Sequence, residues 1–160
     1  MINLKRFALF SALVFSISLL SACSGGGDSL EYEVLAKSES GDAGTHTNSA
    51  QLITDEEMLK MAVERTGVEI DKEAIDFDET HVFQISLHEN GCGYLLDTVT
   101  NSGGTLQFMF ELTPVVEEGE DPEDVICSEI AVPSTFFVKT DAVDFSSLEI
   151  YGSGEKIKSE

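Results

Sequence analysis

The feature that most restricts the fold of this chain is an alternation of apolar and polar side chains with a period of two residues. Residues 105–111 place three apolar side chains on one face of an extended segment: Leu106, Phe108 and Phe110. Because successive side chains of a strand point to opposite faces, this spacing predicts a half-buried β-strand with those three residues in the core.

Other segments have the same strand-like composition, and turn residues separate them. They are residues 30–37, 51–53, 82–87, 94–100, 125–132, 134–139 and 145–151, with a break expected at Pro133. Asn101 to Gly104 predicts a tight hairpin. Short strands joined by frequent turns are typical of an antiparallel sandwich or barrel, so we expect a mainly β domain with a minor α part.

One helix is predicted near residues 55–66. Thr54 and Glu57 have the spacing of a capping box. Four apolar side chains then recur at helical spacing: Met58, Leu59, Ala62 and Val63. Gly67 follows them, and glycine commonly ends a helix in the left-handed conformation.

Length and charge narrow the classes of partner. The chain has 160 residues, which favours one domain. Its formal net charge is -21, which disfavours nucleic acid and anionic membrane surfaces as partners, since both require a basic face. Hydrophobic residues make up 42%, so the chain is not a disordered acidic tail.

The N-terminus has the pattern of a bacterial lipoprotein signal peptide. Two cations, Lys5 and Arg6, precede the apolar run Ala8 to Leu20, which is too short to span a bilayer. The next segment, Leu20-Ser21-Ala22-Cys23, resembles a lipobox. This resemblance implies cleavage before Cys23 and lipid on its sulfur and its new amino group.

These boundaries predict a signal peptide (1–22), a lipid-anchored flexible tether (23–29), one β-rich domain (30–151) and a frayed tail (152–160). The membrane is a partner through the lipid on Cys23, which places the protein in the cell envelope. Ser24 after the cysteine favours the outer membrane, by analogy with enteric lipoproteins. The domain is then expected in the periplasm or at the cell surface.

Cys92 and Cys127 remain after lipidation, and in an oxidising compartment they predict one disulfide. The bond would close a loop of about 36 residues and contribute roughly 3–4 kcal/mol. A reactive or metal-binding thiol pair is the alternative. The chain contains no CxxC motif, and His88 is the only histidine within four residues of either cysteine.

The turn that contains Gly91, Gly93 and Tyr94 is the candidate protein-binding site. Glycine permits positive φ, and a disulfide at Cys92 would stiffen the loop. An exposed Tyr94 on this stiffened loop would bind another protein at low entropic cost. The alternative is that Tyr94 packs at the start of its strand.

No catalytic residue, cofactor or metal ligand is predicted. The sequence contains no GxSxG, HExxH or P-loop motif, and a disulfide-bonded Cys92 has no thiolate. His81 and His88 would face opposite sides of one strand, and His46 lies in a polar loop. Glu117 to Asp124 has six acids in eight residues, which is either a Ca²⁺-responsive site or a solvated loop.

The order of several segments resembles the PrcB C-terminal family, lipoproteins of a bacterial protease complex. The matching segments are residues 32–35 with 40–41, 51–57, 75–79, 82–85, the turn 91–94, 106–111, Cys127, and Pro133 leading to 137–139. The resemblance implies a non-catalytic accessory domain that binds another envelope protein, such as a protease. Cys92 within the turn and the acidic segment 117–124 depart from the family pattern.

The leading function is therefore a lipid-anchored, non-catalytic protein-binding or accessory module of the cell envelope. It could bind through the turn from Gly91 to Tyr94, or by adding a strand to an exposed sheet edge. The Gly-Tyr turn is also similar to a loop of chagasin-type peptidase inhibitors, which makes peptidase inhibition an alternative function. A Ca²⁺-responsive acidic envelope module is the third.

We expect the mature protein purified from envelopes to begin at an acylated Cys23. Intact-mass spectrometry would detect the added lipid and the loss of residues 1–22. An unmodified amino end would contradict the lipoprotein prediction.

Overall fold

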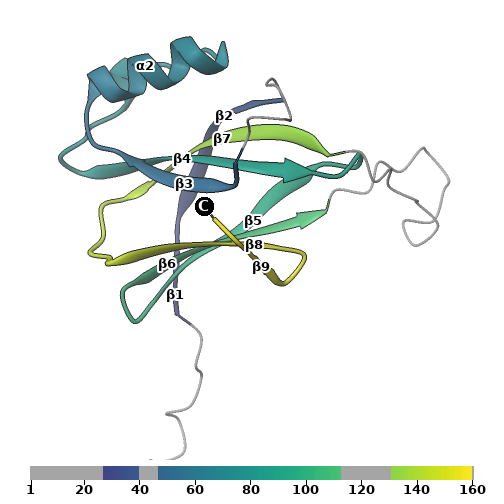
Figure 1. Ribbon diagram of the computed structural model, residues 1–160. Coiled ribbons are helices and arrows are strands. Elements are labelled where there is room, and N and C mark those ends of the chain that lie inside the picture. The colour runs from purple at the N-terminus through teal and green to yellow at the C-terminus, as the bar shows by residue number, and fades with distance from the viewer. Residues whose placement is uncertain (1–26, 40–46, 113–130, 160) are drawn as a thin grey trace, which may run out of the picture.

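The computed structural model describes residues 27–39, 47–112 and 131–159, which form two β-sheets packed face to face with one α-helix outside them (Figure 1). The strands are β1 (Asp28–Leu30), β2 (Tyr32–Ser38), β3 (Ser49–Ile53), β4 (Thr80–Glu89), β5 (Tyr94–Ser102), β6 (Thr105–Leu112), β7 (Val132–Asp141), β8 (Ser147–Gly152) and β9 (Glu155–Ile157). The helix is α2 (Glu56–Thr66), and a short 3-10 helix covers Lys72–Ala74. The predicted mainly β class with a minor α part is confirmed.

The chain passes between a five-stranded sheet, in the order β1-β5-β6-β8-β9, and a four-stranded sheet, in the order β2-β7-β4-β3. Neighbouring strands pair antiparallel except β6 and β8, which are parallel. The parallel pair arises because β7, which separates them in sequence, lies in the other sheet, so the chain returns to β8 by a crossover. The sequence pattern predicted only antiparallel pairing.

The core lies between the two sheets. Leu106, Phe108 and Phe110 are buried, as the alternation predicted. The ring centroids of Phe83 and Phe108, which come from different sheets, lie 5.0 Å apart, and those of Phe110 and Phe136 lie 4.9 Å apart. Aromatic pairs of this kind stabilise the fold by about 0.5–1.5 kcal/mol beyond the contribution of the apolar area that they bury.

Helix α2 covers part of the outer face of the four-stranded sheet (Figure 1). Its buried residues, Leu59 and Ala62, belong to a second apolar cluster with Val82 and Phe137 of that sheet. The helix ends at Gly67, whose φ of 71° is left-handed as predicted. The sheet is therefore apolar on both faces over the area under the helix.

The start of the helix differs from the capping box predicted at Thr54. Asp55 is the N-cap, and its carboxylate accepts a hydrogen bond from the Met58 backbone N–H at 2.8 Å. This bond is the main reason that the pKa of Asp55 is lowered. A carboxylate at this position also interacts favourably with the positive end of the helix dipole.

The sequence predicted a strand break at Pro133. This prediction is wrong, because β7 continues through Pro133. β7 pairs with β4 along its whole length, whereas its pairing with β2 begins only at Thr135. Among the strands that the structure describes, Pro133 therefore has a neighbour on one side only, and proline is tolerated there as in an edge strand.

Both predicted ends of the domain are also wrong. Asp28 and Ser29, assigned to the flexible tether, pair with β5 as part of β1. A Cβ on Gly27 would lie 2.6 Å from the Asn101 carbonyl oxygen, so the glycine permits this approach. The tail is not frayed, because β9 pairs with β8 and Ile157 packs against the core.

Several predictions concern segments outside the described residues. They are the signal peptide, Cys23, His46, the acidic segment 117–124 and Cys127. Within the described ranges, no helix is long and apolar enough to cross a membrane.

Replacing Phe83 with Ala should lower the free energy of unfolding by about 3–5 kcal/mol, because the fully buried ring leaves a cavity between the sheets. Leu95→Ala is the control, since Leu95 is 58% exposed and its loss should change stability by about 0.5 kcal/mol or less. Denaturant unfolding of both variants measures the difference. Equal losses would contradict the assigned core.

Candidate functional site

The predicted binding turn is a connection between the two sheets. Glu89 ends β4 of the four-stranded sheet, and Tyr94 begins β5 of the five-stranded sheet. Asn90 shapes the turn, because its side-chain oxygen accepts from the Cys92 N–H at 3.1 Å and its carbonyl accepts from the Gly93 N–H at 3.1 Å. Gly93 has φ 80°, which explains the glycine at this position.

Tyr94 is half-buried, so it lacks the exposed side chain that the binding interpretation requires. Its ring packs edge to face on Phe110, with centroids 6.3 Å apart. Its hydroxyl would lie 2.9 Å from a Cβ on Gly152, so that glycine leaves room for it. Tyr94 therefore packs at the start of its strand, and the exposed apolar residue next to the turn is Leu95.

A buried ion pair lies beneath the turn, and the sequence did not reveal it. The Glu89 side chain is 1% exposed and accepts a hydrogen bond from Lys37 Nζ at 3.0 Å. Lys37 also contacts the Glu39 carboxylate at 3.1 Å and lies 5.1 Å from the centroid of the Phe136 ring. Two carboxylates and an aromatic face thus surround the ammonium that compensates the buried charge of Glu89.

A cavity of about 350 Å³ lies beside this pair, lined by Lys37, Glu39, residues 89–95 and Val132. The second carboxylate oxygen of Glu89, Oε1, has no hydrogen-bond partner, but less than 1 Å² of it is accessible. It is therefore closed off from the cavity in this conformation. We assign the pair a structural role, because it joins β2 to β4 below the turn.

Cys92 is not a free thiol. Its predicted partner, Cys127, lies outside the described residues, so the pairing stays a prediction. Gly91, Gly93 and Tyr94 lie in the connection between the two sheets.

The edges of the two sheets differ in how well they are protected against pairing with another strand. β1 and β9 have three residues each, and β9 carries Glu155 and Lys156. β2 carries charged side chains and a bulge between Val34 and Ala36. Short length, charge and bulges are the usual devices that prevent strand addition at an edge.

β3 has none of these devices. Its five residues, SAQLI, pair regularly with β4 and include no charge, proline or bulge. Within the described residues its other edge has no paired strand. β3 is therefore the edge best suited to accept a further strand, and its lack of charge in so acidic a chain was the sequence signal for it.

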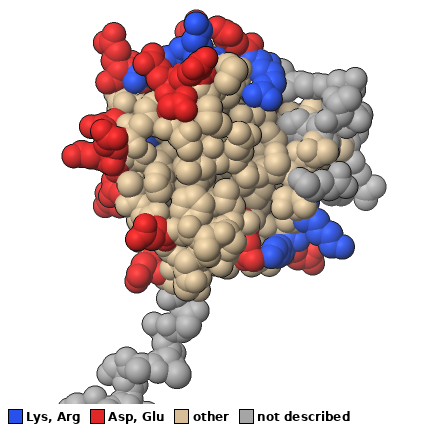
Figure 2. Space-filling model, turned by 60° about the vertical axis from the view of Figure 1, so that its left-hand side comes forward, with Lys and Arg blue, Asp and Glu red and all other residues tan. Residues whose placement is uncertain are grey.

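The surroundings of β3 are uncharged on one side and acidic on the other. Ala50 and Leu52 face the core between the sheets, and β3 approaches β8 of the opposite sheet. Half-buried apolar side chains also pack against this core: Val143, Phe145, Leu148 and Ile157. Figure 2 shows a broad area without charged side chains, with acidic side chains along its left margin and both acidic and basic side chains at its top and lower right.

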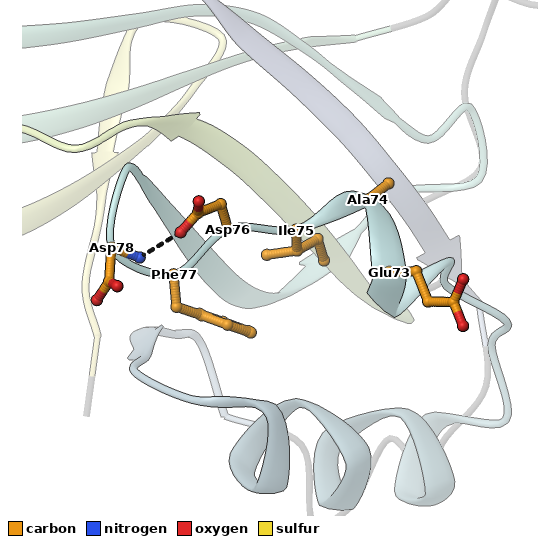
Figure 3. Close-up of a pocket in the computed structure, with 6 residues that line it drawn as sticks. All are labelled: Glu73, Ala74, Ile75, Asp76, Phe77 and Asp78. Carbon is orange, nitrogen blue, oxygen red and sulfur yellow. Dashed lines mark hydrogen bonds between the residues drawn. The ribbon is translucent and has the colours of Figure 1, made fainter.

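A second cavity, of about 430 Å³, is lined by residues 73–78. Its three acids do not converge, because the carboxylate of Glu73 points away from those of Asp76 and Asp78 (Figure 3). Asp76 is already used in the turn, where it accepts from the Asp78 N–H at 2.9 Å. Phe77 points toward α2 and packs against the cluster under the helix.

Over the described ranges, no group of three or more histidine, cysteine or acidic side chains is placed to hold a metal ion. His81 packs against Phe83 and Phe145 on one face of β4. His88 is an odd number of residues away on the same strand and lies on the other face, as predicted.

The outer face of the five-stranded sheet carries a polar network at β8 and β9. The Lys156 ammonium, the Tyr151 hydroxyl and the Gln107 amide all donate to the Glu149 carboxylate. These bonds lower the pKa of Glu149 to about 2, with Lys156 the largest cause. The bond to Glu149 also raises the pKa of Tyr151. The network joins three strands and has a structural role.

Comparison of the chain with models of known protein families, with curated proteins and with solved structures finds no match. The resemblance to the PrcB C-terminal family therefore depends on the segments quoted above.

Replacing Lys37 with Met should lower the free energy of unfolding by about 3 kcal/mol, because the charge of Glu89 stays buried without its partner. The loss is at the lower end of the range for buried pairs, since the Lys37 side chain is 28% exposed.

The matched control is Lys139→Met, whose partner Glu33 is 59% exposed, so the loss should be about 1 kcal/mol or less. Urea unfolding at neutral pH compares the two variants. If Lys37→Met costs no more than Lys139→Met, the pair beneath the turn has no special role.

Proposed function

We propose that this protein is a non-catalytic protein-binding module, held in the cell envelope by lipid on Cys23. The observation that carries the proposal is the edge of β3 that has no paired strand among the described residues; β3 also lacks charge, proline and bulge. An extended segment of another protein can join such an edge through main-chain hydrogen bonds. The domain would then act as an accessory subunit of its partner.

The position of the anchor supports this role. The described domain begins at Gly27, four residues after Cys23, so lipid on Cys23 would keep the domain close to the bilayer. Its partner would then be another envelope protein. The resemblance to the PrcB C-terminal family suggests a protease as one candidate, and a disulfide between Cys92 and Cys127 would stabilise the domain in that compartment.

Of the two binding modes that the sequence left open, strand addition at a sheet edge is better supported than binding through the turn. The turn with Tyr94 is a closed corner, whereas β3 is the open edge of the four-stranded sheet. We therefore move the proposed contact from residues 91–94 to residues 49–53.

A photo-crosslinking amino acid at Gln51, in the full-length protein in its native cells, should give an adduct with a second protein. Gln51 is exposed on β3. The control position is Val34, which is 40% exposed on β2, the opposite edge of the same sheet. Gel electrophoresis and mass spectrometry of the adducts measure the difference.

Adducts of the same size and yield from both positions would contradict binding at β3. So would a complete absence of adducts at Gln51.

A further inference from the structure

We propose that the strand added to β3 belongs to a partner segment with alternating apolar and basic residues. This inference rests on the proposed function and deepens it by naming the chemistry of the partner. It follows from the two different faces that an added strand would have beside β3.

The inner face of the added strand would meet apolar side chains. In β3, Ala50 and Leu52 face the core between the sheets. The next strand in the sheet would continue this face beside the apolar core, to which the half-buried Leu148 of the nearby β8 belongs. Alternate residues of the partner should therefore be apolar, because burial of apolar surface contributes about 25 cal/mol per Å².

The outer face of the added strand would lie beside Gln51 and toward α2. The first turn of α2 carries Glu56 and Glu57, and its N-cap is Asp55. Basic residues on the outer face of the partner would therefore be attracted, and acidic residues would be repelled.

A second copy of this chain fits the edge less well than a basic segment. Pairing of β3 with β3 would bring together two chains that each carry a net charge of -21. Like charges at a contact oppose association. The net negative charge of the chain therefore favours a cationic partner over a second copy of the same chain.

The test uses seven-residue peptides that alternate Val and Lys, and the purified domain with its disulfide intact. Binding should shift the backbone amide NMR signals of residues 49–53. Two peptides serve as controls. One alternates Val and Glu, and the other is the Val/Lys peptide with N-methyl groups on alternate residues, which keeps the charge but removes N–H donors.

We expect the Val/Lys peptide to bind at least tenfold more tightly than either control. Gln51→Lys should weaken its binding about three- to fivefold, through like-charge repulsion at a surface site. Val34→Lys adds the same charge on the opposite edge and should leave the affinity unchanged.

Equal binding of the N-methylated peptide, equal binding of the Val/Glu peptide, or no binding of any peptide would overturn the inference. A dimer of the free domain that protects the amides of β3 would also overturn it, as would protection of those amides in the free monomer by the chain itself. If crosslinking from Gln51 still captures a second protein, the proposed function survives and only the partner chemistry is wrong.

Discussion

The aromatic layer between the two sheets is the interaction on which the rest of the structure depends. Phe83 and Phe136 from one sheet meet Phe108 and Phe110 from the other, and all four side chains are almost fully buried. The chain passes from sheet to sheet several times, and each crossing is stable only while this layer holds the sheets together. The closed turn at Gly93 is one of these crossings.

The ion pair of Lys37 and Glu89 follows from the same geometry. The inner face of β4 continues to the end of the strand, so Glu89 points between the sheets where apolar side chains would otherwise lie. A charge at that depth requires a partner, and Lys37 reaches it from β2. The turn above the pair is consequently a structural corner, and the half-buried Tyr94 completes its packing.

A sandwich of two open sheets leaves strand edges to protect. Three of the edges here are short, charged or bulged, and β3 is the exception among the described strands. The high negative charge opposes association between copies of the chain, so an unprotected edge is compatible with a monomer. The same negative charge favours a basic partner. The proposed binding at β3 and the proposed chemistry of the partner therefore both follow from the negative charge of the chain.

Local patterns in the sequence determined the class of the fold, the strand with Leu106, Phe108 and Phe110 in the core, and the end of the helix at Gly67. Periodicity and backbone preference act within a few residues, so they are readable without the fold. Pairing between distant segments is not readable in this way. Only the tertiary structure decided that β6 and β8 are parallel, that Glu89 meets Lys37, and that β3 lies at an edge. The first two depend on residues that are about 40 or more positions apart in the chain. The third depends on which strand lies beside which in the sheet.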